Sequence, residues 1–229
     1  MKTLRAMVVF IVTSSGYLGF MLLGWGLNDL QGFFSDPTRM AYALIVVCFA
    51  ALVGIQSYSS LAGIQDGKDE IGKRVRRQSS VGLLLLLLLL ASLVFLPYTS
   101  RRGLVVFPGS VFLSWLGAGL CGIGYFLIFW SGLALGRQYS AEVTIQKDHQ
   151  LITSGPYHLI RHPRYLGILL VAFGLTLLFH TWLGLAVTAL AKGLTLFRIQ
   201  DEEDLMHSHF GKAWEEYCQH SWRLVPHVF

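Results

Sequence analysis

Six apolar runs alternate with short polar segments along the 229-residue chain. They occupy residues 6–27, 40–64, 81–96, 108–135, 164–179 and 182–199. Because a helix rises about 1.5 Å per residue and needs about 20 residues to cross a bilayer, six crossings fit this pattern, with the last two runs short. The pattern predicts an all-α, polytopic membrane protein with about six transmembrane helices.

Only residues 180–182 separate the last two runs, which predicts a tight helical hairpin that need not reach fully across the bilayer. The polar stretch after it predicts a terminal helix outside the membrane. The first run follows Lys2 and Arg5 but is long and lacks a small-residue cleavage site, so we expect a retained helix. No linker divides the chain. We expect three spans in 1–107, and the other spans with a cofactor-binding module in 108–229.

The composition agrees with a membrane protein, because 54% of the residues are hydrophobic, 14% are charged and the mean hydropathy is +0.55. The net charge of +5 comes from basic residues beside the apolar runs, where they face lipid head groups, so membrane lipids are expected partners and nucleic acid is not. The three cysteines are scattered, which supports neither a disulfide framework nor a thiolate metal site.

The basic residues also predict the orientation of the chain. With a cytosolic N-terminus, 14 of the 18 lysines and arginines fall on the cytosolic side, three fall on the other side, and Lys192 lies within the last run. Both termini are then cytosolic. The same orientation places the polar segments 136–163 and 198–229 together at the cytosolic face.

The stretch "SGPYHLIRHPRYLGILL", residues 154–170, carries polar groups at the start of an apolar run. Gly155 and Pro156 signal a turn, and His158, His162 and Tyr165 recur at helical spacing, so we expect them on one helix face. Pro163 interrupts that helix, and freed backbone groups here need an aqueous cavity or protein partners. Zinc on the two histidines is disfavoured, since no third ligand is fixed, and we predict no metal.

The stretch "RIQDEEDLMHSHFGKAWEEY", residues 198–217, continues the last run with ionisable residues. Arg198 and Glu202 are four apart and can pair on one face. Glu203 is turned about 100° away, so the two acids are not expected to serve the same partner. Two ionisable segments at one membrane face predict the walls of a single site.

"LITSGPYHLIRHPRYLG" followed by "RIQDEEDLMHSHFGKAWEEY" resembles the isoprenylcysteine carboxyl methyltransferase family, whose C-terminal module is shared with phospholipid methyltransferases. The resemblance covers about residues 135–229. It implies S-adenosylmethionine as cofactor and a lipophilic or lipidated acceptor. The residues that it implies are, for the cofactor, His149, Leu151, Tyr157, His162, Tyr165 and Glu203, and, for catalysis near the acceptor, Arg161, Arg198 and Glu202.

These residue types suit that chemistry. Carboxylates and aromatic faces attract a sulfonium cation, and an arginine can hold a carboxylate by two hydrogen bonds. A carboxylate acceptor needs no general base, whereas an amine or phenol needs one, for which Glu202 or His162 is a candidate. We therefore predict a membrane-embedded, S-adenosylmethionine-dependent methyltransferase, with O-methylation of a carboxylate as one candidate reaction.

Two other functions compete with this prediction. The tail "FGKAWEEYCQHSWRLVPHVF" also resembles the ends of membrane sterol reductases, which implies reduced nicotinamide dinucleotide phosphate as the cofactor. The segment "TSGPY", which precedes "RHPRY", favours the methyltransferase over the reductase. A scaffold or transporter would carry charges within several spans, and apart from Lys192 few are found.

Overall fold

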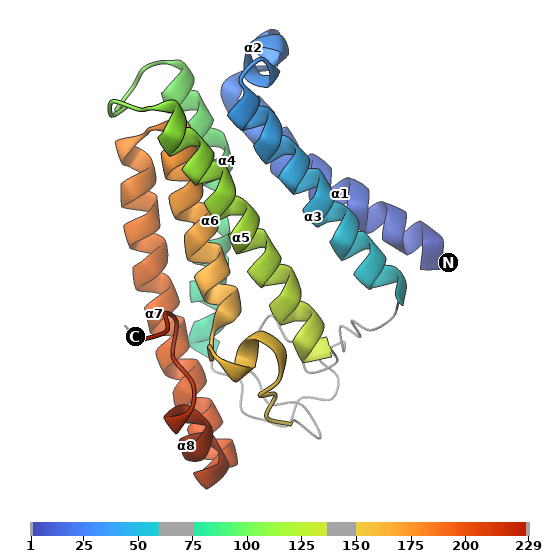
Figure 1. The fold of residues 1–229 in the computed structure, drawn as a ribbon, viewed down its shortest axis with the longest axis vertical. Coiled ribbons are helices and arrows are strands. Elements are labelled where there is room, and N and C mark those ends of the chain that lie inside the picture. Colours follow the sequence, from blue (N-terminus) through green and yellow to red (C-terminus); the bar gives the residue numbers. More distant parts are fainter. Residues whose placement is uncertain (1, 60–75, 137–149, 228–229) are drawn as a thin grey trace.

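The computed structural model describes residues 2–59, 76–136 and 150–227, and these residues form a bundle of long helices (Figure 1). Short helices η1 (Leu27–Asp29), α2 (Leu30–Phe34) and η4 (Gly155–His158) lie between or before the long ones. The others are α1 (Lys2–Trp25), α3 (Pro37–Ser59), α4 (Arg76–Arg101), α5 (Val111–Leu135), α6 (Pro163–Phe179), α7 (Trp182–Phe210) and α8 (Lys212–Gln219).

Five helices, α1, α3, α4, α5 and α7, are long and apolar enough to cross a membrane, and α6 is a shorter apolar helix of 17 residues. The described segments contain isolated β-bridges and no strand. The predicted all-α, multi-pass membrane fold is confirmed. The predicted boundary near residue 107, between N-terminal spans and a cofactor-binding module, stays a prediction. Helix α4 packs against α1 on one side of this boundary and against α7 on the other.

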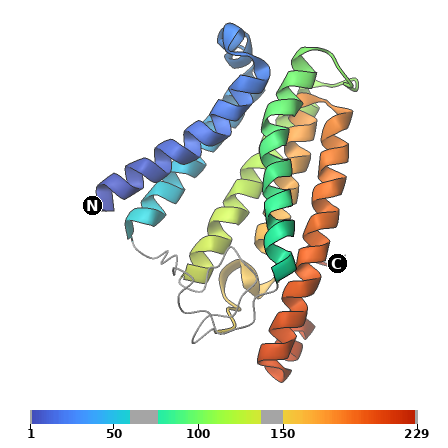
Figure 2. The same ribbon diagram turned by 180° about the vertical axis from the view of Figure 1, so that it is seen from behind.

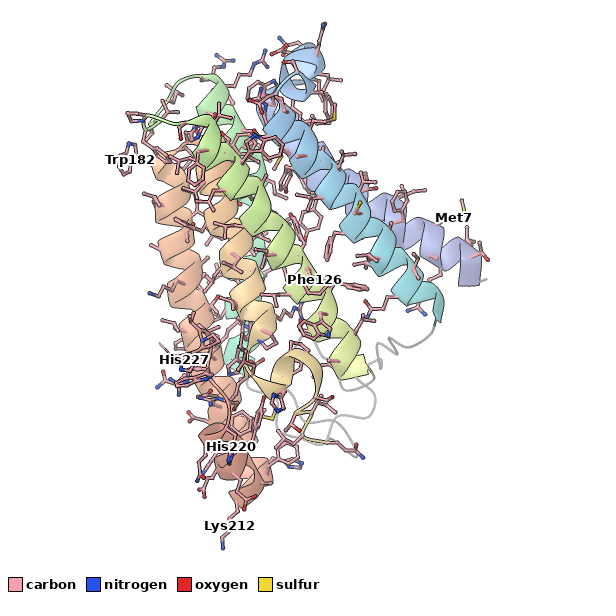
Figure 3. The ribbon with its side chains drawn as sticks, viewed as in Figure 1. Met7, Phe126, Trp182, Lys212, His220 and His227 are labelled. Carbon is pink, nitrogen blue, oxygen red and sulfur yellow. The ribbon has the colours of Figure 1, made fainter. Side chains whose placement is uncertain are left out.

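The hairpin of α6 and α7 reaches the same end of the bundle as α4 and α5. Its turn contains His180 in the left-handed region (φ 48°), followed by Thr181. The Phe107 N–H donates to the His180 carbonyl and the Trp182 N–H donates to the Val105 carbonyl, both at 2.9 Å. In Figure 3, Trp182 accordingly lies at the end of the molecule opposite Lys212. The α6–α7 turn and the link between α4 and α5 therefore lie together at one end of the molecule.

Helix α7 extends well beyond the apolar run that predicted it. The run ends near residue 199, but the helix has 29 residues and is about 44 Å long, more than the thickness of a bilayer core. Neither proline nor glycine interrupts the polar continuation until Gly211, whose φ of +52° ends the helix. The last turns of α7 therefore extend past the ends of the neighbouring helices, as Figure 2 shows from behind.

Helices α5 and α6 touch through a seam of glycines. Gly117 lies against Gly174, and Gly124 lies against Gly167, so the two pairs repeat every seven residues. A Cβ atom at position 167 would lie 2.6 Å from the carbonyl oxygen of Gly124, which is backbone and cannot swing away. Small residues allow close packing of this kind where no hydrophobic effect drives helices together.

Gly167→Ala is expected to destabilise the protein by about 1–3 kcal/mol, because the added methyl group must separate two helix backbones. Gly119→Ala on α5 is the matched control, since nothing lies within 4 Å of a Cβ atom there. The control is expected to be neutral or slightly stabilising, as alanine favours a helix over glycine by about 1 kcal/mol. Thermal unfolding in detergent compares them. Equal midpoints for the two variants would contradict the seam.

Candidate functional site

The segment before α6 makes a sharp turn and not a continuous helix. Gly155 has a φ of +62°, the 3₁₀ turn η4 ends at His158, and α6 begins only at Pro163. His158 is exposed, whereas His162 and Tyr165 are buried. The expectation that these three side chains share one helix face is therefore wrong. The physical reason is Pro163, which keeps the residue before it out of the helical region and starts a new helix.

The C-terminal tail fastens this turn to the rest of the bundle. The backbone N–H of Arg161 donates to the Trp222 carbonyl at 2.7 Å, and that of His162 donates to the Arg223 carbonyl at 3.2 Å. In return, the Trp222 N–H donates to the Leu159 carbonyl at 2.9 Å. We call residues 221–224 the strap. The strap fixes the residues on either side of the "RHP" sequence, so segments distant in the chain meet at one place.

His162 is the centre of the site and lies between Glu202 and Glu203, two of the four acids of α7. Its Nδ1 is 3.4 Å from Glu202 Oε2, and its Nε2 is 3.2 Å from Glu203 Oε1. The prediction that the two acids cannot serve one partner is therefore wrong. An imidazole has a nitrogen on each side of its ring, so it can bridge carboxylates that point in different directions from a helix.

This bridge implies a protonated His162. Ionised carboxylates only accept hydrogen bonds, so both ring nitrogens must carry a proton to bond to Glu202 and Glu203 together. Burial by itself lowers the pKa of His162, but the hydrogen bonds and charges of the two carboxylates outweigh it and raise the pKa above 6.5. While it is cationic, His162 has no lone pair with which to act as a general base, and its candidacy as a base stays a prediction.

Glu203 is enclosed by cationic side chains. The Arg161 Nε donates to Oε1 at 3.0 Å, and Arg223 Nη2 lies 2.5 Å from Oε2. Together with His162, three positive groups engage the two oxygens of one carboxylate whose side chain is 11% exposed. A carboxylate at this depth requires such partners, because an unpaired charge there is costly. Glu203 thus ties α7 to the "RHP" turn and to the strap.

Arg198 and Glu202 meet through a tyrosine. The Arg198 Nε donates to the Tyr165 hydroxyl at 3.0 Å, and that hydroxyl donates to Glu202 Oε1 at 3.0 Å. Arg198 is buried, whereas the Glu202 side chain is 25% exposed. The network therefore runs without a break from Arg198 to the strap.

The structure brings together most of the residues that the sequence singled out. They form what we call the charge network, together with Arg223: Arg161, His162, Tyr165, Arg198, Glu202 and Glu203. Tyr157 is buried beside it, and its carbonyl accepts a hydrogen bond from the Tyr217 hydroxyl at 2.6 Å. Leu151 is half-buried, and His149 lies outside the described residues. Their predicted roles stay predictions.

The sequence analysis missed Arg223 and the strap. Arg223 stands 20 residues after Glu203 in a stretch without periodicity, so spacing gives no sign of their contact. Helix α8 packs against the turn before α6, since Trp214 is buried and the Tyr217 hydroxyl donates to the Tyr157 carbonyl. Across the network, three arginines and one histidine cation face two carboxylates. Within the charge network, the cationic groups therefore outnumber the carboxylates.

Comparisons with known proteins agree with the motif. The model of the isoprenylcysteine carboxyl methyltransferase (ICMT) family matches residues 117–208, which confirms the predicted family resemblance and extends it into α5. A "Probable protein-S-isoprenylcysteine O-methyltransferase" of Oryza sativa subsp. indica is 32% identical over 120 residues. These residues are 51% of this chain and 63% of the rice protein, so the match spans less than two thirds of that relative.

Two further matches concern the fold and the competing function. A solved structure of the eukaryotic intramembrane Ras methyltransferase ICMT aligns over 98% of both chains, with a TM-score of 0.54 and 18% identity. At this identity the likeness shows a shared fold, including the N-terminal helices. The Delta(14)-sterol reductase TM7SF2 of Mus musculus is 36% identical over 87 residues, which are 35% of this chain and 20% of the reductase.

The thermal midpoint of the protein is expected to fall as the pH rises through the raised pKa of His162. A group with a higher pKa in the folded state stabilises that state fully below its ordinary pKa of 6.5, and the contribution is lost once the folded-state group deprotonates. His162→Gln is expected to begin from a lower midpoint and to lose less of it up to about pH 9. Scanning fluorimetry in detergent measures both. Parallel curves would contradict the cationic histidine.

Proposed function

We propose that the chain is a membrane-embedded methyltransferase that uses S-adenosylmethionine to methylate the carboxylate of a lipophilic acceptor. The observation that carries the proposal is the charge network, which lies within the module that resembles the ICMT family. The family match supports a methyl donor as cofactor. The identity of that donor as S-adenosylmethionine and the class of acceptor are our inference from the residues.

The residues near Glu202 fit a cationic methyl donor. S-adenosylmethionine would supply a methyl group on a positively charged sulfur. Glu202 is the network carboxylate with an exposed part, and it stands next to the hydroxyl of Tyr165. A carboxylate and aromatic rings attract such a cation. Both oxygens of Glu203 are engaged by other side chains, so we assign Glu203 to positioning His162, Arg161 and the strap.

The excess of positive charge favours an anionic acceptor. An amine acceptor would arrive as a cation and would need a base, and a protonated His162 cannot act as one. A carboxylate oxygen can attack the methyl carbon directly while the carbon–sulfur bond breaks, and no proton moves. Arg198 is suited to hold that carboxylate, because a guanidinium presents paired N–H groups. The remaining task of the site is to orient the two groups and exclude water.

We also propose that both termini and the charge network face the cytosol. The N-terminal end of α1 lies away from the end of the molecule formed by α2 and the α4–α5 link, as do the start of α6 and the last turns of α7 (Figures 1 and 2). The excess of lysine and arginine in the sequence supports a cytosolic position for these three segments. A water-soluble donor then enters from the cytosol and a lipophilic acceptor enters from the membrane.

The protein in detergent is expected to bind S-adenosylmethionine and its demethylated product in calorimetry. Glu202→Gln keeps the shape of the side chain but removes the charge, and it is expected to weaken S-adenosylmethionine about tenfold or more. The product carries no sulfonium charge, so its affinity is expected to change less. Binding of reduced nicotinamide dinucleotide phosphate in place of both nucleosides would overturn the proposal and favour the reductase.

Arg198→Ala is expected to retain S-adenosylmethionine affinity within about threefold but to lose methyl transfer at least 100-fold, because the acceptor carboxylate loses its guanidinium. Transfer of a radioactive methyl group measures this with two lipophilic carboxylates, a farnesylated cysteine derivative and a long-chain fatty acid. A collapse of cofactor affinity in the folded variant would place Arg198 on the donor side instead. Methylation of neither acid by the unaltered protein would refute the acceptor class.

A further inference from the structure

Helix α4 approaches the Arg198 guanidinium at the one glycine of that helix. A Cβ atom built on Gly82 would lie 2.4 Å from Arg198 Nη1 and 3.4 Å from its Cζ. The distance to Nη1 is shorter than any ordinary contact, so a side chain at position 82 would displace that end of the guanidinium. Arg198 is buried and its Nε bonds to Tyr165, so α4 and α6 confine the guanidinium from two sides.

Gly82 is an unfavourable residue for its place in the sequence. It precedes a run of eight leucines, in the interior of a 26-residue helix, where glycine costs about 1 kcal/mol relative to alanine. The seam glycines of α5 and α6 are explained by contacts with neighbouring backbone. Gly82 instead meets the far end of a flexible cationic side chain. Its absent side chain leaves room for a guanidinium and does not serve helix packing.

We infer that Gly82 is a positioning residue for the acceptor, and that α4 forms a wall of the acceptor site. The inference rests on the proposed function in that it takes Arg198 to bind the acceptor carboxylate. Gly82 sets where the guanidinium stands relative to Tyr165 and Glu202, and so where the carboxylate is held. Helix α4 precedes the residues 117–208 that match the family model, so a residue outside that match would influence acceptor selection.

Gly82→Ala tests this inference with little risk to the fold. The added methyl group meets the end of a flexible side chain, which can rotate away, so the thermal midpoint is expected to stay within about 2 °C of the unaltered protein. The KM for a carboxylate acceptor is expected to rise about tenfold, with S-adenosylmethionine affinity unchanged. Gly119→Ala, where a Cβ atom has open space, is the control and should leave KM and S-adenosylmethionine affinity unchanged, with an equal or slightly higher thermal midpoint.

A double-mutant cycle measures the interaction between positions 82 and 198. Arg198→Lys replaces the forked group by a narrower ammonium, so it is expected to impair the unaltered protein more than the Gly82→Ala protein. A coupling of at least threefold in kcat/KM supports the contact between the two positions. Additive effects would overturn it, as would a loss of stability like that expected for Gly167→Ala.

A binding measurement separates this inference from the proposed reaction. A fluorescent polyunsaturated fatty acid and its methyl ester serve as probes in detergent micelles. The acid is expected to bind about fivefold more weakly to Gly82→Ala than to the unaltered protein, with no change for the ester. If the acid binds more weakly to Gly82→Ala but no methyl transfer is found, the role of Gly82 is supported and the proposed reaction is not. Equal acid affinity in the two proteins would overturn the role of Gly82 whatever the activity.

Discussion

The site depends on keeping two adjacent carboxylates charged at the edge of a membrane. Glu202 and Glu203 follow the apolar part of α7 directly, where unpaired charge is expensive. The structure meets this requirement by placing one histidine cation between them and two arginines around the inner one. Because these partners come from the turn before α6 and from the strap, satisfying the charges also joins distant parts of the chain.

In this arrangement Glu203 and Glu202 have different roles. The inner one is saturated with hydrogen bonds and holds the architecture, while the outer one keeps part of its surface in contact with its surroundings. Their difference is one of environment and not of residue type. A histidine that is hydrogen-bonded on both sides is an orienting cation and not a proton acceptor. The geometry thus leaves Glu202 and not His162 as the carboxylate or imidazole in this network with an accessible lone pair.

Local patterns in the sequence predicted the helices and many of the site residues well. The apolar runs, the break at residues 180–182 and the ordered "RHP" and "DEED" segments each depend on neighbours within a few positions. What was missed depends on tertiary contacts. The bridge by His162 requires knowing how the turn before α6 is placed against Glu202 and Glu203, and the contact of Arg223 with Glu203 requires the path of the strap. The length of α7 was underestimated because hydropathy marks the membrane and not the end of a helix.

The glycine seam between α5 and α6 has a consequence for traffic within the bilayer. Backbone atoms there are so close that even one methyl group would force the helices apart, so this interface is closed to an acyl or isoprenyl chain diffusing in from the lipid. The glycine seam is therefore not a route from the lipid into the bundle. A hydrocarbon tail can reach the interior only through another interface of the bundle.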